Sequence, residues 1–256
     1  LYAVPINAHK FFKLSCSYEQ SASAHRLPFV IAASASGSGK TAVTMAMMKA
    51  FKNAGKKVRA CKCGPDYIDP MFHSRIIGAK SANLDLHFFS ENTLRFLLAK
   101  NAAGCDVSVI EGAMGFYDGA GLTTWKTSAY ELALVTKTPV VLVVNARGAA
   151  LSVLAVIEGF LRFRPESGIR GVILNQCTAM TYASLSAAIE ERFGIRCFGF
   201  LPRLDECVLE SRHLGLVTAG EIRDLREKMQ TLAAQAEKTL DIDALLALAH
   251  KAEPLD

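Results

Sequence analysis

No stretch of this 256-residue chain is apolar for the roughly 20 residues that a membrane-spanning helix needs. The chain also has no dense tract of Lys and Arg and no interleaving of basic with aromatic residues. Internal repeats and low-complexity tracts are absent. We therefore expect neither a membrane nor a nucleic acid as a partner. The net charge of +5 suits an anionic small molecule instead.

The seven cysteines lack a metal-binding arrangement. Cys61 and Cys63 are separated by one residue, which is not a zinc-ligand spacing, and no second pair completes a four-ligand set. Most of the cysteines lie in or beside apolar, strand-like segments. This pattern favours buried, reduced thiols over disulfides, and therefore a cytoplasmic protein.

The remaining composition is that of a globular protein, with 51% hydrophobic and 21% charged residues. Short apolar segments alternate with longer segments of helical periodicity, including 41–55, 90–100, 182–194 and an amphipathic stretch past residue 220. Such alternation predicts an α/β fold with a doubly wound, mostly parallel sheet, whose ligands gather at the carboxyl ends of the strands. The expected strands are Phe29–Ala33, Lys57–Cys61, Val107–Ile110, Val140–Val144, Gly171–Leu174 and Cys197–Leu201.

A phosphate-binding loop, SASGSGKT at residues 34–41, follows the first expected strand and precedes a helix. The glycines let backbone N–H groups face the phosphates, and the helix offers its positive N-terminus. The lysine is expected to reach the β- and γ-phosphates, and the threonine hydroxyl to bind Mg²⁺. The predicted phosphate-binding residues are Ser36, Gly37, Ser38, Gly39, Lys40 and Thr41.

Charged residues end the next two expected strands. Lys62 precedes the segment GPDYIDP at 64–70, and Glu111 ends the strand at 107–110. Because these ends lie beside the phosphate loop, we expect Lys62 to neutralise the transferred phosphoryl group and Asp66 and Glu111 to hold Mg²⁺. A purely structural interpretation is also open, since Pro and Asp build turns and Asp caps helices.

Six segments occur in order along the chain, namely FVIAASASGSGKTAVT, KCGPDYIDPMFH, NLDL, VIEGAMGFYDG, GVILNQ and LPRLDECVLESRHLGLVTAGE. Together they resemble the synthetase domain of the cobyrinic acid a,c-diamide synthase family, and the resemblance runs from about residue 28 to 250. It implies a nucleotide domain like that of dethiobiotin synthetase, with ATP and Mg²⁺ used to amidate the a and c carboxylates of a corrinoid precursor. Related members act on hydrogenobyrinic acid or a nickel sirohydrochlorin.

The resemblance also implies residue roles in forming an acyl phosphate that ammonia then attacks. Asp66, Asp69 and Glu111 would hold Mg²⁺ and orient the substrate, with Lys62 as the fourth catalytic residue. Asn175 would hydrogen-bond adenine, and the absence of an N-K-x-D signature favours ATP over GTP. The tetrapyrrole would be contacted by Tyr67, Ile68, Arg212 and His213, although His213 could equally be a structural histidine.

The implied organisation has three parts. Residues 1–26 are expected to be a poorly ordered leader, 27–240 the synthetase domain, and 241–256 the start of a linker. The glutaminase domain that follows in the family is missing from this chain, so nitrogen would come from such a domain elsewhere or from free ammonia. A homodimer is left open.

Two positions depart from the expected patterns. The leading glycine of the phosphate loop is replaced in the region of Ala33 and Ser34, and Asn145 stands where the family usually has aspartate. Two other functions, a MinD-type ATPase switch and dethiobiotin synthetase, fit the sequence less well. A MinD-type ATPase switch would carry a second lysine where this chain has Ala35, and dethiobiotin synthetase is shorter and lacks the ESRHLGL segment.

Overall fold

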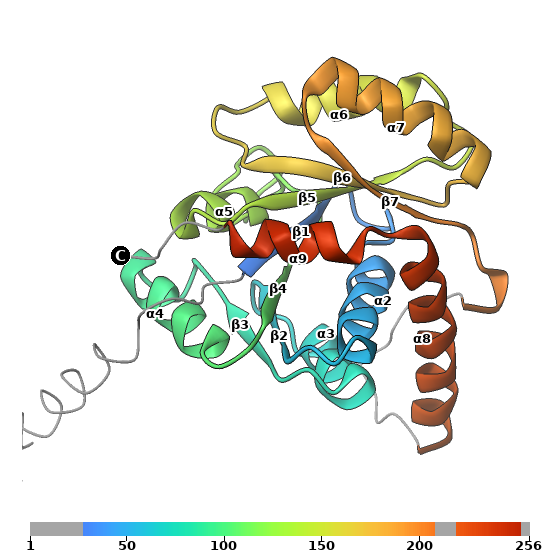
Figure 1. The fold of residues 1–256 in the computed structure, drawn as a ribbon. Coiled ribbons are helices and arrows are strands. Elements are labelled where there is room, and N and C mark those ends of the chain that lie inside the picture. The colour runs from blue at the N-terminus through green and yellow to red at the C-terminus, as the bar shows by residue number, and fades with distance from the viewer. Residues whose placement is uncertain (1–27, 208–218, 252–256) are drawn as a thin grey trace, which may run out of the picture.

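The computed structural model describes residues 28–207 and 219–251. A seven-stranded sheet in the order β3-β2-β4-β1-β5-β6-β7 forms its centre, and every neighbouring pair is parallel (Figure 1). The predicted α/β class is therefore confirmed. The strands are β1 Pro28–Ala33, β2 Val58–Cys63, β3 Ser81–Leu84, β4 Val107–Glu111, β5 Val140–Asn145, β6 Ile169–Asn175 and β7 Arg196–Leu201.

The six expected strands all form, but the sequence interpretation missed β3. This strand is four residues long, and its first three side chains are only partly buried. It lies at the edge of the sheet, beside β2. A short edge strand lacks the continuous apolar run that marks a strand buried on both faces.

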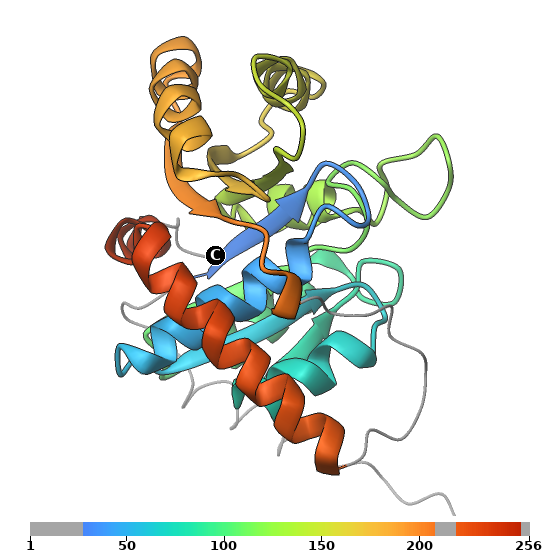
Figure 2. The same ribbon diagram turned by 90° about the vertical axis from the view of Figure 1, so that its right-hand side faces the viewer.

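Helices cover both faces of the sheet (Figures 1 and 2). Alternate residues of β1 enter different cores, with Phe29 and Ile31 on the α2 side and Val30 and Ala32 on the other. Helices α2, α3, α8 and α9 pack on the first side, and α4, α5, α6 and α7 on the second. The bounds are α2 Lys40–Asn53, α3 Ile68–Phe72, the π-helix η1 His73–Ile77, α4 Glu91–Ala102, α5 Ala129–Thr136, α6 Ser152–Arg162, α7 Ala179–Phe193, the 3₁₀ turn η2 Asp205–Cys207, α8 Ala219–Thr239 and α9 Ile242–His250.

The C-terminal segment differs from the expected linker. Asp241 caps helix α9 through a 2.9 Å bond from Ala244 N, and Leu245 and Ala249 are fully buried in the core beneath β1 and β4. Residues 242–250 therefore belong to the folded domain, because their apolar side chains close one face of the sheet. The expected leader, 1–26, and the last residues, 252–256, lie outside the described part of the chain.

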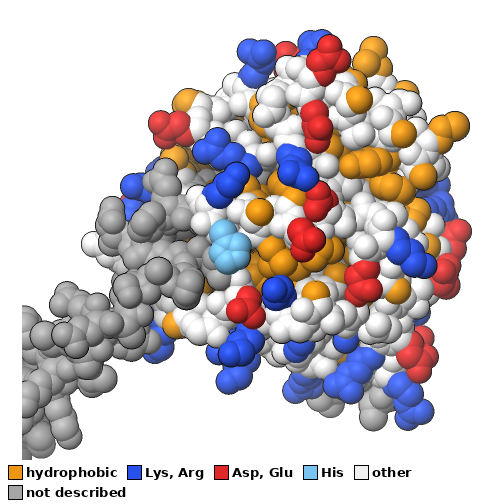
Figure 3. Space-filling view, in the orientation of Figure 1, with side chains coloured by type: hydrophobic (Ala, Val, Ile, Leu, Met, Phe, Trp, Pro, Cys, Tyr) orange, Lys and Arg blue, Asp and Glu red, His pale blue; other side chains and the backbone are white. Residues whose placement is uncertain are grey.

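The face that α8 and α9 cover shows acidic and basic side chains interspersed around exposed apolar atoms (Figure 3). On another side, the long connection between β4 and α5 extends away from the sheet (Figure 2). Among the described helices, none is both long and apolar enough to cross a bilayer.

Candidate active site

The phosphate loop occupies residues 34–39, between β1 and α2. Gly37 and Gly39 have φ angles of +77° and +87°, which L side chains rarely adopt. Lys40 begins α2, is 8% exposed, and its Nζ donates to the carbonyl of Met114 at 3.1 Å. Burial lowers the pKa of Lys40, and the nearby Lys62 ammonium lowers it further.

Thr41 and Glu111 meet behind this loop. Thr41 Oγ1 donates to Glu111 Oε1 at 2.6 Å, and the Glu111 side chain is fully buried at the end of β4. The threonine proton is engaged by the carboxylate, so the hydroxyl lone pairs remain available for a cation in the cleft. This arrangement fits a hard, oxygen-ligated cation such as Mg²⁺.

Lys62 lies at the centre of the carboxylates. Its Nζ donates to Asp69 Oδ2 at 2.6 Å, to Glu111 Oε1 at 3.3 Å and to the Gly112 carbonyl at 3.2 Å, and lies 3.8 Å from Asp66 Oδ2. These three acceptors account for all three protons of the ammonium group. The strand ends thus bring Lys62, Asp66, Asp69 and Glu111 together, as expected from the sequence.

The charges in this cluster shift one another's pKa. Burial alone disfavours the charged forms. For Lys62 the carboxylates of Glu111 and Asp69 outweigh burial and raise the pKa above its ordinary value. For Glu111 the Lys62 ammonium and the hydrogen bonds from His73 and Thr41 outweigh burial and hold the pKa well below its usual range. The cluster therefore favours the charged forms of Lys62 and Glu111, whereas burial and the Glu111 carboxylate raise the pKa of Asp69.

The segment GPDYIDP both builds a turn and supplies acids. Asp66 Oδ1 accepts from Ile68 N at 2.8 Å and from Asp69 N at 3.3 Å, which starts helix α3. Asn83 on β3 donates to the Asp66 carbonyl at 2.8 Å and ties the turn to the sheet. Tyr67 is 81% exposed, whereas Ile68 is half-buried against the core. The capped-turn interpretation is correct for Asp66 Oδ1, while Asp66 Oδ2 faces Lys62.

Sequence reasoning missed two contributors. His73 is fully buried and its Nε2 lies 2.8 Å from Glu111 Oε2. Met114 has a φ of +47° and directs its carbonyl to Lys40. His73 belongs to the segment KCGPDYIDPMFH, but no spacing in the sequence indicates that a residue after β2 contacts the end of β4. The Met114 contact is made by backbone, which leaves no signal in the residue type.

A cleft of 640 Å³ opens beside the phosphate loop. Asn175 forms part of its wall, and its Nδ2 donates to the Ser38 carbonyl at 3.0 Å. Asn145 lies close by, at the end of β5, and accepts from Arg147 N at 3.0 Å. Arg212 and His213 fall outside the described residues. The lining residues include Gly37, Gly39, Lys40, Thr41, Asp66, Ile68, Asp69, Arg147, Asn175 and Arg203.

In residues 28–207 and 219–251, no group of three or more His, Cys, Asp or Glu is arranged to hold a metal ion by itself. Mg²⁺ usually takes only one or two protein ligands and completes its shell with phosphates and water.

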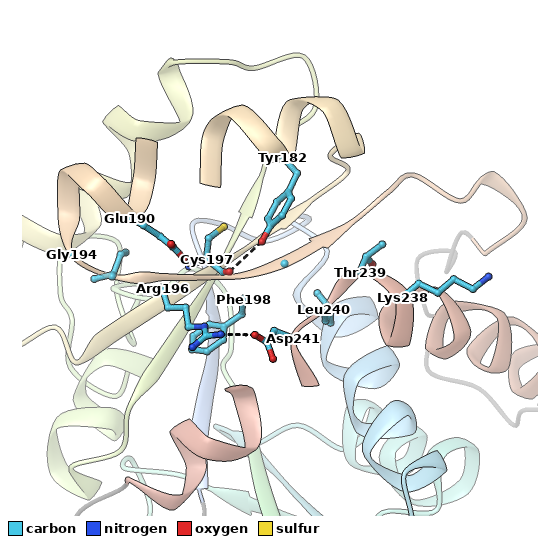
Figure 4. Close-up of a pocket in the computed structure, with 12 residues that line it drawn as sticks. Tyr182, Glu190, Gly194, Arg196, Cys197, Phe198, Lys238, Thr239, Leu240 and Asp241 are labelled. Carbon is cyan, nitrogen blue, oxygen red and sulfur yellow. Dashed lines mark hydrogen bonds and ion pairs between the residues drawn. The ribbon is translucent and has the colours of Figure 1, made fainter. Parts of the chain in front are cut away.

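A second cavity, of 840 Å³, lies along edge strand β7 and the junction of α8 and α9 (Figure 4). Several of its polar groups are paired with one another or with the backbone. Tyr182 donates to the Cys197 carbonyl at 3.2 Å, Glu190 accepts from Cys197 N at 2.9 Å, and Arg196 pairs with Asp241. The contacts from Tyr182 and Glu190 satisfy backbone groups of edge strand β7.

A parallel sheet whose central strand leads through a Gly-rich loop into a helix, with lysine and threonine in the first turn, defines a P-loop nucleotide-binding domain. The chain belongs to the CbiA family, described as the CobQ/CobB/MinD/ParA nucleotide binding domain, which matches residues 29–216. Nucleotide binding by this domain follows from that membership.

Two curated relatives are named cobyrinate a,c-diamide synthase. The chain is 41% identical to the Listeria monocytogenes protein over 221 residues and 41% identical to the Clostridium acetobutylicum protein over 219. These matches cover 86% and 85% of this chain but 49% of each relative, so the chain spans about half their length. MinD in the Aquifex aeolicus MinC:MinD complex shares the fold, with a TM-score of 0.52 and 15% identity, over 90% of this chain and 98% of that one.

Proposed function

We propose that this chain is the nucleotide-dependent half of an enzyme that uses ATP and Mg²⁺ to amidate the a and c carboxylates of a corrinoid precursor, cobyrinic or hydrogenobyrinic acid. The observation that carries the proposal is the position of Lys62 between Asp69 and Glu111, together with the hydrogen bond from Thr41 of the phosphate loop to the same Glu111 oxygen. The names of the relatives support the substrate class. The buried free thiols are in keeping with a cytoplasmic reaction.

The proposed metal-binding residues are Thr41, Asp66 and Glu111. The Thr41 hydroxyl donates its hydrogen bond to Glu111, so its oxygen lone pairs face the cleft. Asp66 is half-exposed on the same side, and Glu111 acts from behind the hydroxyl. When bound, Mg²⁺ supplies positive charge to the β- and γ-phosphates of ATP.

Amidation requires an activated carboxylate, because a carboxylate oxygen is a poor leaving group. One oxygen of the substrate carboxylate attacks the γ-phosphorus, the bond to ADP breaks, and an acyl phosphate forms. Ammonia then attacks the acyl carbon, loses a proton, and expels inorganic phosphate. Lys40 and Lys62 stabilise the charge on the transferred group, with Lys62 exchanging one of its present acceptors for a phosphoryl oxygen.

The apolar surface beside the cleft suits a large, flat ligand. Tyr67 follows β2, Phe88 follows β3, and Met114 and Leu122 follow β4, and all four are exposed by 55% or more. Because β3, β2 and β4 are neighbours, the loops that carry these four residues leave the same carboxyl edge of the sheet, and we propose that the four side chains form one apolar rim there. We propose that the rim, with Ile68 beneath it, contacts the tetrapyrrole face while the acids and lysines receive its carboxylates.

The test is amidation by the purified chain, supplied with Mg·ATP, ammonia and the candidate tetrapyrroles, with mono- and diamide products measured by mass spectrometry. Ammonia replaces the glutaminase domain as nitrogen donor. Asp66→Asn and Asp69→Asn should each slow amidation by roughly 10²–10³, which is far more than they weaken ATP binding. If both variants amidate at the wild-type rate, the segment is only a helix start.

The same assay separates the alternatives. ATP hydrolysis without amidation of any tetrapyrrole would favour a MinD-type switch over a ligase. ATP-dependent reaction of a dethiobiotin precursor alone would favour a dethiobiotin synthetase-like ligase.

A further inference from the structure

We propose that His73 is a positioning residue: it holds one oxygen of Glu111 so that the other oxygen fixes the Thr41 hydroxyl for the metal of Mg·ATP. This inference rests on the proposed use of Mg·ATP at the site. It assigns a role to a residue that touches neither nucleotide nor substrate in the proposed mechanism.

The contacts of His73 are complete and entirely buried. The residue is the first of η1, the π-helical turn that continues α3, and its side chain is 0% exposed. Nε2 lies 2.8 Å from Glu111 Oε2, and Nδ1 lies 3.1 Å from Ser81 Oγ at the start of β3. The ring therefore joins the segment after β2 to the strands on both sides of β2.

The direction of these hydrogen bonds follows from the chemistry of the carboxylate. Glu111 Oε1 accepts hydrogen bonds from the Thr41 hydroxyl at 2.6 Å and from the Lys62 ammonium at 3.3 Å, which is the arrangement of a carboxylate. An ionised carboxylate only accepts hydrogen bonds, so Nε2 must carry the proton and donate it. In the neutral ring Nδ1 then accepts, and the Ser81 hydroxyl donates to it. Ser81 thus selects the tautomer that can hold Glu111.

The two oxygens of Glu111 have different tasks. Oε2 accepts from His73, whereas Oε1 accepts from Thr41 at 2.6 Å and from Lys62 at 3.3 Å. Among the described residues, His73 is the hydrogen-bond donor to Oε2, so removing it leaves Oε2 without a donor at a fully buried position. The carboxylate is then free to rotate toward Lys62, and the Thr41 proton loses its fixed acceptor. Outer hydrogen bonds of this kind typically change metal affinity by about 10–100-fold.

A buried histidine can instead be a space-filling core residue, and the choice of variants separates the two roles. Gln and Met have similar length and volume, but only Gln places an N–H donor near the position of Nε2. His73→Gln should therefore retain the contact with Glu111, and His73→Met should lose it. His87, an exposed histidine on the loop after β3, provides the control variant His87→Met.

The experiment measures ATP affinity by calorimetry with Mg²⁺ and with EDTA, on the whole chain. We expect His73→Met to weaken Mg·ATP binding by about tenfold and to leave metal-free ATP binding unchanged, because the loop and Lys40 do not contact His73. His73→Gln and His87→Met should bind both forms as the wild type does. In the amidation assay, the KM for Mg²⁺ should rise in His73→Met.

Three results overturn the inference. Equal loss of Mg·ATP and ATP affinity in both His73 variants would make the residue a packing element. Unchanged Mg·ATP binding in His73→Met would also exclude a positioning role for His73. The proposed function would still stand in that case if the wild type binds Mg·ATP more tightly than metal-free ATP. A wild type that binds ATP equally with and without Mg²⁺ contradicts both proposals.

A measurement on the wild type does not depend on the folding of any variant. Long-range ¹H–¹⁵N spectra of the histidine ring nitrogens report which nitrogen carries the proton. We expect Nε2 of His73 to be protonated in the wild type. Protonation on Nδ1 alone would contradict the proposed hydrogen bond to Glu111.

Discussion

Single residues at the carboxyl edge of the sheet balance one another's charge before any ligand is bound. Lys62 is 4% exposed and Glu111 0%, and each is held by partners whose distances lie between 2.6 and 3.3 Å. A buried charge without such partners would be strongly unfavourable. The site is therefore preorganised, and the reaction requires exchange of partners more than movement of the backbone.

Gly39 is the residue of the phosphate loop with the least freedom to change. A Cβ at this position would lie 2.0 Å from Asn175 Nδ2, and the φ of +87° disfavours any L side chain. Gly39→Ala should therefore distort the loop and weaken ATP binding by at least about tenfold, because the cost of forcing a side chain into this region is about 1–2 kcal/mol or more. Calorimetry with ATP measures the loss, and Gly55→Ala, at a turn with open space, is the control. Wild-type affinity in Gly39→Ala would show that the loop can relax.

The buried thiols predict an alkaline limit to stability. Burial raises the pKa of Cys61 to about 12, whereas a thiol in the unfolded chain titrates near about 8.5. Above about pH 8.5 the Cys61 thiol loses its proton in the unfolded chain but keeps it in the folded protein, so the free energy of unfolding falls as pH rises. The free energy of unfolding should decline between about pH 8 and about pH 11, and less steeply in Cys61→Ala. Parallel pH profiles for the two proteins would remove Cys61 from this effect.

At this scale the sequence predicted most of the residues that meet, because charged residues at strand ends converge in a parallel sheet. It could not predict which pairs form. Lys62, expected at the γ-phosphate, has all its protons engaged by protein acceptors, and Asn175 supports the loop backbone in addition to lining the cleft. Such contacts depend on register between β2 and β4, where Lys62 is paired with Glu111.

Among the elements, α9 shows where the reading of the sequence was incomplete. The ending KAEPLD suggested a linker, yet the preceding residues form a helix whose Leu245 is 0% exposed. The expected amphipathic helix past residue 220 does form as α8, and its Met229, Leu232 and Ala236 are buried against the domain. Propensity and periodicity located α8 because it is long, but α9 has only nine residues.

The packing of α9 gives a direct stability test. Leu245→Ala should lower the free energy of unfolding by about 2–5 kcal/mol, because a fully buried leucine leaves a cavity when truncated. Leu246→Ala should lower the free energy of unfolding by less, because Leu246 is only partly buried. Urea titrations of the two variants provide the comparison. An unchanged midpoint for Leu245→Ala would mean that α9 is not part of the cooperative unit.

The apolar rim formed by Tyr67, Phe88, Met114 and Leu122 is likewise testable as a unit. Phe88→Ser should weaken binding of the tetrapyrrole by about tenfold, since burying an aromatic side chain is worth about 1.5–3 kcal/mol. Phe96→Ser removes a side chain of comparable exposure, 55%, from α4 and should have no effect. Absorbance titrations with the corrinoid measure both. Equal affinities in all three proteins would exclude Phe88 from the substrate surface.

For the molecule as a whole, the order of strands explains how distant segments share one site. Residues between 37 and 204 line one cleft because β2, β1, β5, β6 and β7 all end at the same edge. The fold is shared with proteins as different as MinD, so it does not by itself specify a reaction. The chain also spans about half the length of its curated relatives, which is why the activity rests on the site chemistry and needs a direct chemical test.

The central claim is that the substrate carboxylate is activated by phosphoryl transfer, and the fate of one oxygen atom tests it. The corrinoid precursor is labelled with ¹⁸O in its carboxylates and incubated with the chain, Mg·ATP and ammonia, and the inorganic phosphate released is analysed by mass spectrometry. Because the acyl phosphate passes a carboxylate oxygen to phosphorus, one ¹⁸O should appear in phosphate for each amide formed. Amide formation with unlabelled phosphate would contradict the account.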